Sequence, residues 1–198
     1  MTLAVPLARF EQWWSEAKRA DPSDLASVMV LSSVDARGRP SSRIVLLRAF
    51  DARGFVFNTN LQSDKGEQLR QRPFAALNFH WTHTAEGQLG RQVRVEGSVE
   101  QVGTDEADAY FAQRARESQL GAWASDQSRP LPDRAVLLAR LEEFRLRFPG
   151  TVPRPPHWSG LRVIPDAIEL WSEGTARLHV RERFTRAGDL WTSSLLFP

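Results

Sequence analysis

Residues 177–184 (RLHVRERF) form a basic stretch whose spacing would suit a strand that faces an anion. Alternate residues of a strand share a face, and here one face would carry Arg177, His179, Arg181 and Arg183. The opposite face would be mostly apolar and could pack in a core. Guanidinium donors and a titratable imidazole suit an anionic or oxygen-rich ligand, although a solvated strand face would show the same parity.

A second candidate is the stretch RIVLLR, residues 43–48, in which an arginine stands at each end of four aliphatic residues. Arg43 and Arg48 are five positions apart, so on a regular strand they face opposite sides. The residues between them are apolar on both faces, which indicates a central strand. A buried unpaired cation is costly, so a phosphate could compensate either arginine; two snorkelling arginines at strand ends are the ordinary alternative.

Two further segments carry donors for an oxyanion. Ser63 is predicted to cap a helix over 64–72 that holds Lys65 in its first turn, and helix N-termini attract phosphate. Tyr110, Arg114 and Ser118 follow at helical spacing of four, which predicts that they share one side of a helix. The segment SDQS, residues 125–128, adds amide and hydroxyl donors. Taken singly, the first of these segments is better explained as an ordinary capped surface helix.

The composition excludes several other kinds of site. The 198 residues include no cysteine, which rules out disulfides, thiolate metal sites and cysteine nucleophiles. There is no Walker A motif and no G-x-G-x-x-G, and His80 and His83 have no acidic cluster beside them, so we expect no metal. The 26 basic residues are interspersed with 24 acidic ones, a pattern that argues against nucleic-acid binding.

The N-terminal sequence lacks a basic segment followed by a long apolar core, so it does not predict a signal peptide. No apolar run approaches membrane-spanning length. We therefore expect a cytoplasmic protein that does not associate with a membrane.

The elements that would position these residues follow from periodicity and turn signals. Helices are predicted over 7–19, 64–72, from a cap at Thr104 onward, and over 133–148. Strands are predicted over 27–34, 42–50, 55–60, 74–81, 91–102, 159–165, 167–171, 177–185 and 189–197. Short turns between strands imply antiparallel pairing, so the fold class is mostly β with flanking helices (α+β), a β-barrel. We expect a single domain over 1–198, with an N-terminal helix within 1–20 and a Pro-rich connector at 149–158 inside the domain.

Seven motifs in this order resemble the pyridoxamine 5′-phosphate oxidase family from about residue 27 to the C-terminus: RIVLLR, FVFNTNLQSDKGEQL, RQVRVEG, YFAQRARESQLGAWASDQS, PRPPHWSGLRV, IELW and RLHVR. The resemblance implies an antiparallel split β-barrel of the FMN-binding type and a homodimer with FMN at the subunit interface. It also implies oxidation of pyridoxamine 5′-phosphate or pyridoxine 5′-phosphate to the aldehyde. O2 would reoxidise the flavin and give hydrogen peroxide.

The same resemblance implies residue roles. The positions matching FMN contacts are Arg43, Ile44, Val45, Leu46, Leu47, Asn58, Thr59, Lys65, Gln92, Gln127, Ser128, Trp171 and Arg181. The positions matching the substrate-phosphate cradle are Arg48, Tyr110, Arg114 and Ser118. Arg177 and His179 match the catalytic pair that faces the substrate ring, and Arg183 has no assigned role.

The chain departs from the family pattern around this site. Arg48 stands where lysine is common, Asp64 where a basic residue often helps to hold the FMN phosphate, Val180 where an acidic residue is usual, and Leu195 where arginine is common. The N-terminal segment is shorter than in most members, and the loop at 82–90 is longer. Two alternatives therefore accompany the oxidase hypothesis. One is a flavin oxidase of the phenazine-biosynthesis type with a redirected substrate; the other is a flavin- or pyridoxal-phosphate-binding protein without turnover.

Overall fold

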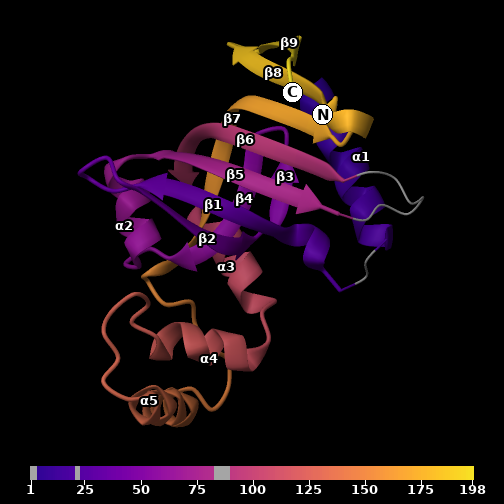
Figure 1. Ribbon diagram of the computed structural model, residues 1–198. Coiled ribbons are helices and arrows are strands. Elements are labelled where there is room, and N and C mark those ends of the chain that lie inside the picture. Colours follow the sequence, from indigo (N-terminus) through magenta and orange to yellow (C-terminus); the bar gives the residue numbers. More distant parts are fainter. Residues whose placement is uncertain (1–3, 21–22, 83–89) are drawn as a thin grey trace.

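The computed structural model describes residues 4–20, 23–82 and 90–198 and forms an antiparallel sheet flanked by helices (Figure 1). The strands are β1 (Val28–Val34), β2 (Pro40–Leu46), β3 (Ala49–Asp51), β4 (Gly54–Asn60), β5 (Phe74–Trp81), β6 (Arg91–Gln101), β7 (Trp158–Ser172), β8 (Val180–Ala187) and β9 (Leu190–Leu196). The α-helices are α1 (Val5–Ala20), α2 (Asp64–Gln71), α3 (Thr104–Ala112), α4 (Arg116–Ala124) and α5 (Arg134–Arg147). Short 3-10 turns occupy Leu25–Ser27 and Thr175–Arg177.

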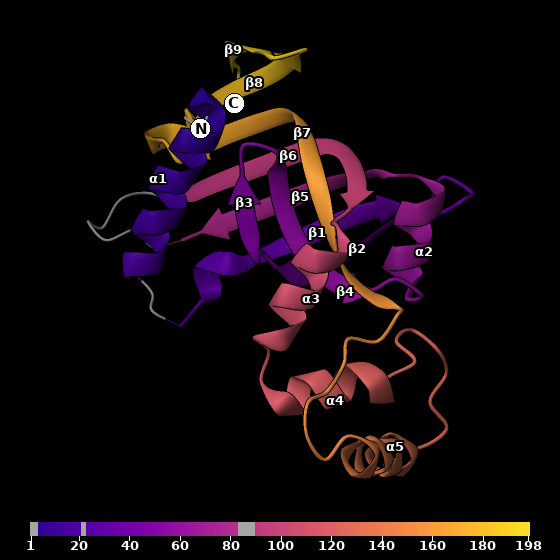
Figure 2. The same ribbon diagram turned by 180° about the vertical axis from the view of Figure 1, so that it is seen from behind.

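The sheet divides at its longest strand. The order is β2-β1-β5-β6-β7-β4-β3, and β8 also pairs with β7 and carries β9. Along one edge β7 pairs with β6 over most of its length. On its other edge β4 pairs with residues 158–163 and β8 with residues 167–172. Two strands thus share one edge of β7, so the sheet curls and splits, as the mostly β split-barrel prediction requires (Figure 2).

The predicted strand over 42–50 is wrong in two respects. It is broken, because β2 ends at Leu46 and β3 starts at Ala49, while the backbone N–H of Arg48 donates to Val56 O at 2.8 Å. It is also an edge strand of the described sheet rather than a central one, and Ile44 is 61% exposed. The first three apolar residues of RIVLLR therefore lie on an edge strand that is partly exposed, and not on a buried central strand.

The predicted strand over 177–185 is wrong at its start. Thr175–Arg177 is a 3-10 turn, Ala176 and Arg177 have positive φ angles, and β8 begins only at Val180. Arg177 therefore does not share the strand face of Arg181 and Arg183. Leu178 and Val180, which parity assigned to a core, are exposed.

One continuous helical side for Tyr110, Arg114 and Ser118 is also wrong. The first helix ends at Ala112 and the next begins at Arg116, so the three residues span a break between α3 and α4. Gly103 rather than Thr104 occupies the N-cap position of α3. The Ser63 cap of α2 is confirmed, since its side chain accepts from the backbone N–H of Gly66.

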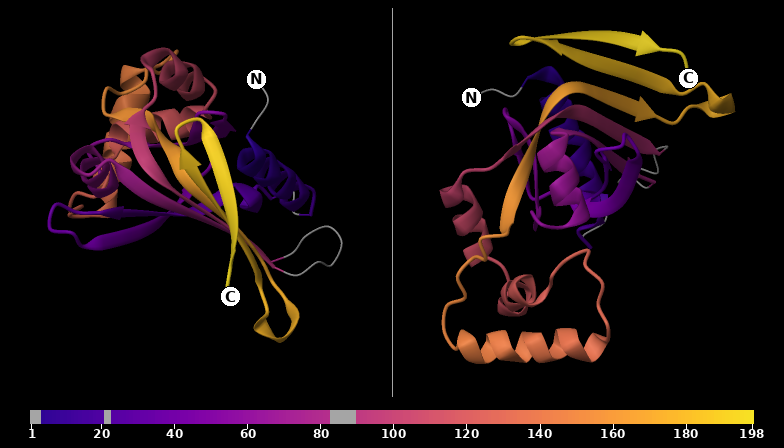
Figure 3. Two further views of the ribbon diagram at one scale, coloured as in Figure 1. Left: turned by 90° about the horizontal axis from the view of Figure 1, so that it is seen from above. Right: turned by 90° about the vertical axis from the view of Figure 1, so that its left-hand side faces the viewer.

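The main core fills the inside of the curled sheet and is closed by α1 (Figure 3). Phe10 of α1 is fully buried, and its ring centroid lies 4.8 Å from that of Phe55 and 5.0 Å from those of Phe50 and Phe79. Such edge-on aromatic contacts add to the area that α1 buries. A smaller core under α3, α4 and α5 contains Phe111, Leu120, Val152 and Trp158. None of the helices in the described part of the chain is long and apolar enough to cross a membrane.

Replacement of Phe10 tests whether α1 is an integral part of the core. We expect Phe10→Ala to lower the free energy of unfolding by about 3–5 kcal/mol, because it removes a buried ring and leaves a cavity. Urea denaturation at fixed protein concentration measures the change. Glu11→Ala, on the exposed side of the same helix, is the control and should change stability little. Equal losses in both variants would contradict the packing role of Phe10.

Candidate functional site

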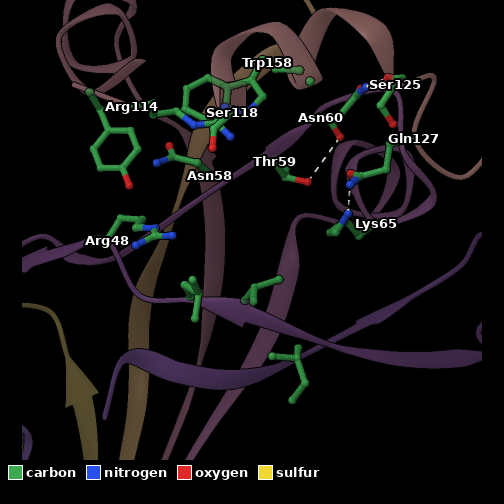
Figure 4. Close-up of a pocket in the computed structure, with 16 residues that line it drawn as sticks. Arg48, Asn58, Thr59, Asn60, Lys65, Arg114, Ser118, Ser125, Gln127 and Trp158 are labelled. Carbon is green, nitrogen blue, oxygen red and sulfur yellow. Dashed lines mark hydrogen bonds between the residues drawn. The ribbon is translucent and has the colours of Figure 1, made fainter. Parts of the chain in front are cut away.

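A cavity of about 480 Å³ opens between β2, β4, the start of α2 and the α3–α4 region (Figure 4). It gathers Ile44, Val45, Leu46, Asn58, Thr59, Lys65 and Gln127 of the predicted flavin set with Arg48, Tyr110, Arg114 and Ser118 of the predicted phosphate cradle. These residues come from β2, β4, α2, α3 and α4 and from three connections, which hold Arg48, Arg114 and Gln127. Pairing of β4 with β7 and the strand break after Leu46 bring them together.

One end of the cavity is defined by Lys65 in the first turn of α2. Its ammonium donates to Gln127 Oε1 at 2.8 Å and to the capping Ser63 Oγ at 3.1 Å. Burial lowers the pKa of Lys65, and the nearby Arg43 guanidinium lowers it further. An anion at this helix N-terminus would relieve both effects.

Arg43 lies behind this end rather than in the cavity lining. Its guanidinium donates to Ser33 Oγ, to Ser41 Oγ at 2.7 Å and to Gln68 Oε1 at 3.1 Å. Burial lowers its pKa as well. Arg43 therefore adds positive charge near Lys65 while most of its donors are held by the protein.

The other end of the cavity holds Arg48 and Arg114, well separated from Lys65 in Figure 4. The Arg114 guanidinium carbon lies 4.8 Å from the centroid of the Trp158 ring, and burial lowers the pKa of Arg114. Its NH1 nitrogen is buried and has no hydrogen-bond partner within the described residues. The same is true of the Nδ2 atom of Asn58, which lines the cavity between the two ends. Buried donors without a protein acceptor are expected where a ligand supplies the acceptor.

A second group of predicted site residues lies away from this cavity. Gln92, Trp171 and Arg181 are neighbours across β6, β7 and β8, and the rings of Trp171 and His179 have centroids 4.7 Å apart. The backbone N–H of Gly174 donates to His179 Nδ1 at 3.2 Å, so the neutral ring carries its proton on Nε2. Figures 1 and 2 show β8 and β9 across the sheet from α4 and α5, so one chain does not unite the two groups.

Some predicted residues line neither place directly, and others were missed. Leu47 packs in the main core, and Ser128, with a positive φ of 70°, follows Gln127 without lining the cavity. Asn60, Gly121, Ala122 and Trp158 also line the cavity, although no role was predicted for them individually, and Ser125 was predicted only as part of the donor segment 125–128. Trp158 is the last residue of the Pro-rich connector and lies within the motif PRPPHWSGLRV. His83 and the long loop predicted at 82–90 fall mostly outside the described residues, and the described part contains no cluster suited to a metal ion.

Solved structures with similar folds define the class of protein first. One is a pyridoxamine 5′-phosphate oxidase-related, FMN-binding protein from Nostoc punctiforme. The superposition covers 100% of this chain and 99% of the Nostoc chain, with a TM-score of 0.76 and 18% sequence identity. PhzG from Burkholderia lata, solved with tetrahydrophenazine-1-carboxylic acid, covers 98% and 92% with a TM-score of 0.88 at 29% identity. The fold is that of the FMN-binding split barrels.

Sequence comparison then gives the family. Residues 22–148 match the pyridoxamine 5′-phosphate oxidase model, and residues 158–198 match the pyridoxine 5′-phosphate oxidase C-terminal dimerisation region. A pyridoxine/pyridoxamine 5′-phosphate oxidase from Caulobacter vibrioides is 56% identical over 98% of this chain and 85% of its own. One from Sphingopyxis alaskensis is 50% identical over 98% and 87%. The chain belongs to the pyridoxamine 5′-phosphate oxidase family.

The cofactor of this family is FMN, and the residues of the cavity fit such a ligand. Lys65 and the N-terminus of α2 suit a phosphate. The Nδ2 group of Asn58, which has no acceptor among the described residues, suits a polar ring. The matched dimerisation region, 158–198, contains the second group of site residues except Gln92, and it supports a homodimer.

Proposed function

We propose that this chain catalyses the FMN-dependent oxidation of pyridoxamine 5′-phosphate and pyridoxine 5′-phosphate to pyridoxal 5′-phosphate. O2 is the electron acceptor and hydrogen peroxide the product. The observation that carries the proposal is one cavity with a cationic group at each end, Lys65 backed by Arg43 and Arg114 beside Arg48. Two separated cationic ends suit two phosphates, one on the cofactor and one on the substrate.

The flavin end of the cavity is the end that contains Lys65. Lys65, Gln127 and Thr59 would hold the phosphate side of FMN, while the backbone of Ile44, Val45 and Leu46 would line its ring, with Asn58 donating to it. Arg43 would not contact FMN directly, but its positive charge behind Lys65 would attract the FMN phosphate. Ser128 would contribute by holding the loop that carries Gln127. Leu47 would act only by anchoring the strand in the core, because it is buried there.

The second group completes the site from the partner subunit. Gln92, Trp171 and Arg181 would meet the flavin of the other chain, with Arg177 and His179 next to the substrate. This arrangement explains why β2, whose Ile44 lines the cavity, and the segment around Leu178 both expose apolar side chains in a single chain. Apolar surface of this kind is expected where a homodimer forms.

The substrate phosphate would bind at the Arg48 end. Arg114 is held against Trp158 with a buried NH1 that has no acceptor among the described residues, so its donor is already oriented before a ligand arrives. Tyr110 and Ser118 add hydroxyl groups on either side of the break between α3 and α4. Arg48 brings the charge of the usual lysine on a planar fork that can bind phosphate through two N–H groups.

FMN supplies the redox chemistry when bound: it takes two electrons with hydrogen from the substrate carbon and passes them to O2. The amine substrate needs one water and yields ammonia with the aldehyde, while the alcohol yields the aldehyde directly. His179 presents an Nε2 proton, since its Nδ1 accepts from Gly174, and can hold the substrate oxygen or nitrogen in place. Arg177, on a backbone with positive φ, would cover the ring with its guanidinium.

The similarity to PhzG keeps a redirected substrate as the alternative, but the cationic pair of Arg48 and Arg114 favours a phosphorylated substrate. The cytoplasmic location and the single domain over 1–198 stay predictions.

A turnover assay tests the proposed reaction. We expect the purified protein to be yellow and, saturated with FMN, to convert both phosphorylated substrates to the aldehyde with one peroxide per aldehyde formed. Absorbance of the aldehyde and a coupled peroxide assay measure this. If the flavin-loaded protein turns over neither substrate, the proposed reaction is refuted, and the phenazine-type oxidase or the binding protein without turnover is favoured. If the protein binds no FMN, every flavin-dependent function is refuted.

Two substitutions distinguish the ends of the cavity. Arg114→Ala should raise KM for pyridoxine 5′-phosphate by about tenfold or more while leaving the Kd for FMN nearly unchanged, since a charge-assisted contact to phosphate is lost. Lys65→Met should show the opposite pattern, with the larger change in the Kd for FMN. Steady-state kinetics and flavin fluorescence titration give the two constants. Equal effects of each variant on both constants would contradict the division of the cavity.

Mixed dimers test whether each site is shared between subunits. Assayed with substrate well below KM, where a raised KM appears as lost rate, Arg114→Ala and His179→Ala should each keep about a tenth of the wild-type activity or less. After random pairing, roughly a quarter of the wild-type activity should return, because half of the dimers are mixed and each has one intact site of two. Sedimentation first checks that every variant is a dimer. No recovery in verified mixed dimers would mean that each chain supplies both groups to its own site.

A further inference from the structure

A row of charged residues lies directly beside the second group of site residues on the same face of the sheet. Arg94 of β6 pairs in register with Glu169 of β7, and Glu169 pairs with Arg183 of β8. The row with Gln92, Trp171 and Arg181 is two positions further along each strand, so the side chains of both rows point the same way. The alternate residues Ile168 and Leu170 face the main core.

Glu169 is the buried centre of this row. Only 2% of its side chain is exposed, and its two carboxylate oxygens accept separately from Arg181, Oε1 from Nε at 2.9 Å and Oε2 from NH2 at 3.2 Å. Arg94 and Arg183 lie further from Oε2, at 3.5 and 3.9 Å. A buried carboxylate is costly unless it is paired and hydrogen-bonded, and the fork with Arg181 provides its closest pairing.

The remaining donors of Arg181 are nearly fixed by this arrangement. Its NH1 nitrogen donates to the backbone oxygen of Phe197, just after β9, at 3.0 Å. A guanidinium has five N–H donors in one plane. Glu169 and Phe197 take three of them, which leaves one N–H on NH1 and one on NH2 in a plane that the protein has already set.

We propose that Glu169 is a positioning residue that orients the Arg181 guanidinium so that its two remaining N–H groups meet the flavin. This inference rests on the proposed function, in which Arg181 contacts FMN from the partner subunit. Glu169 does not touch the ligand; it acts through Arg181. A planar cation held by a fork loses less rotational freedom on binding than one that swings freely, so the flavin binds more tightly.

The neighbouring Glu96 provides a matched control. It belongs to the same charged network, but its hydrogen bonds go to Arg94 at 2.6 Å and to Arg183 at 2.8 Å. Glu96→Gln and Glu169→Gln remove the same charge from the same face of the sheet. If net charge alone mattered, the two variants would weaken FMN binding equally.

The experiment is a double-mutant cycle on FMN affinity, measured by titrating the apoprotein dimer and following quenching of flavin fluorescence. We expect Glu169→Gln to raise the Kd roughly tenfold and Glu96→Gln to change it less than about threefold. Arg181→Ala should raise the Kd, and adding Glu169→Gln to it should cause no further loss, because the carboxylate acts only through the arginine. An additive loss, or equal effects of the two glutamate variants, would overturn the inference.

A flavin-free measurement separates this inference from the proposed function. In the apoprotein, the Nε–H of Arg181 should give a slowly exchanging ¹H–¹⁵N resonance, assigned by its absence in Arg181→Ala. It should exchange faster in Glu169→Gln but not in Glu96→Gln. If the exchange rates are as expected but Arg181→Ala leaves FMN affinity unchanged, Arg181 does not contact the flavin. In that case the role of Glu169 in positioning Arg181 for the flavin is refuted as well. If Arg181→Ala weakens FMN but Glu169→Gln changes neither readout, the inference alone is refuted.

A second variant covers the case in which Glu169→Gln does not fold. Glu169→Asp keeps the charge but shortens the side chain by one methylene, so it cannot keep both hydrogen bonds to Arg181. It should raise the Kd for FMN and speed exchange at the Arg181 Nε–H while the dimer stays intact. Wild-type values for both quantities would overturn the positioning role.

Discussion

The sharing of one edge of β7 by two strands separates the candidate site residues on β4 from those on β8. Residues 158–163 of β7 pair with β4, which carries Asn58 and Thr59 to the cavity. Residues 167–172 pair with β8, which carries Arg181 beside Trp171. A single regular sheet cannot place β4 and β8 on the same edge, so β7 bends and the sheet splits. The same hydrogen-bonding constraint that builds the fold thus separates the site into two groups within one chain.

The two groups of candidate site residues also differ in how their charges are arranged. Lys65 and Arg43 gather at one end of the cavity and Arg48 and Arg114 at the other, and burial lowers the pKa of three of the four, Lys65, Arg43 and Arg114. Around Arg181, by contrast, the carboxylates of Glu169 and Glu96 form ion pairs with Arg94, Arg181 and Arg183. The cations of the cavity suit phosphates, and among them Arg48 NH1 also lies 3.9 Å from Asp24 Oδ2. A cation held by a buried carboxylate is suited to hydrogen bonding in a set direction.

Much of the fold could be predicted from the sequence. The strand over 74–81, the Ser63 cap and the mostly β class follow from local periodicity and capping, and the structure confirms them. The helix predicted over 64–72 ends one residue earlier, at Gln71. The motifs also predicted the residues that line the cavity near Lys65 and Arg114. No individual role could be predicted for Trp158, because its contribution depends on its packing with Leu120 of α4, which no local pattern encodes. Glu169 was missed because a glutamate in an alternating strand usually faces solvent.

The predicted elements are wrong where the chain leaves regular helices and strands, and these positions carry or adjoin candidate site residues. The continuous strand predicted through Arg48 is wrong because β2 stops at Leu46, and the continuous helical side predicted through Arg114 is wrong because α3 stops at Ala112. Strand parity also failed at Arg177, where Ala176 and Arg177 have positive φ. Arg48 and Arg114 line the cavity although each lies in such an interruption. A motif can still be matched across such an interruption, because the match depends only on the order of residues. An argument from periodicity fails there, because it assumes a regular helix or strand. The residues of a site are therefore predicted better by order along the chain than by the face on which periodicity puts them.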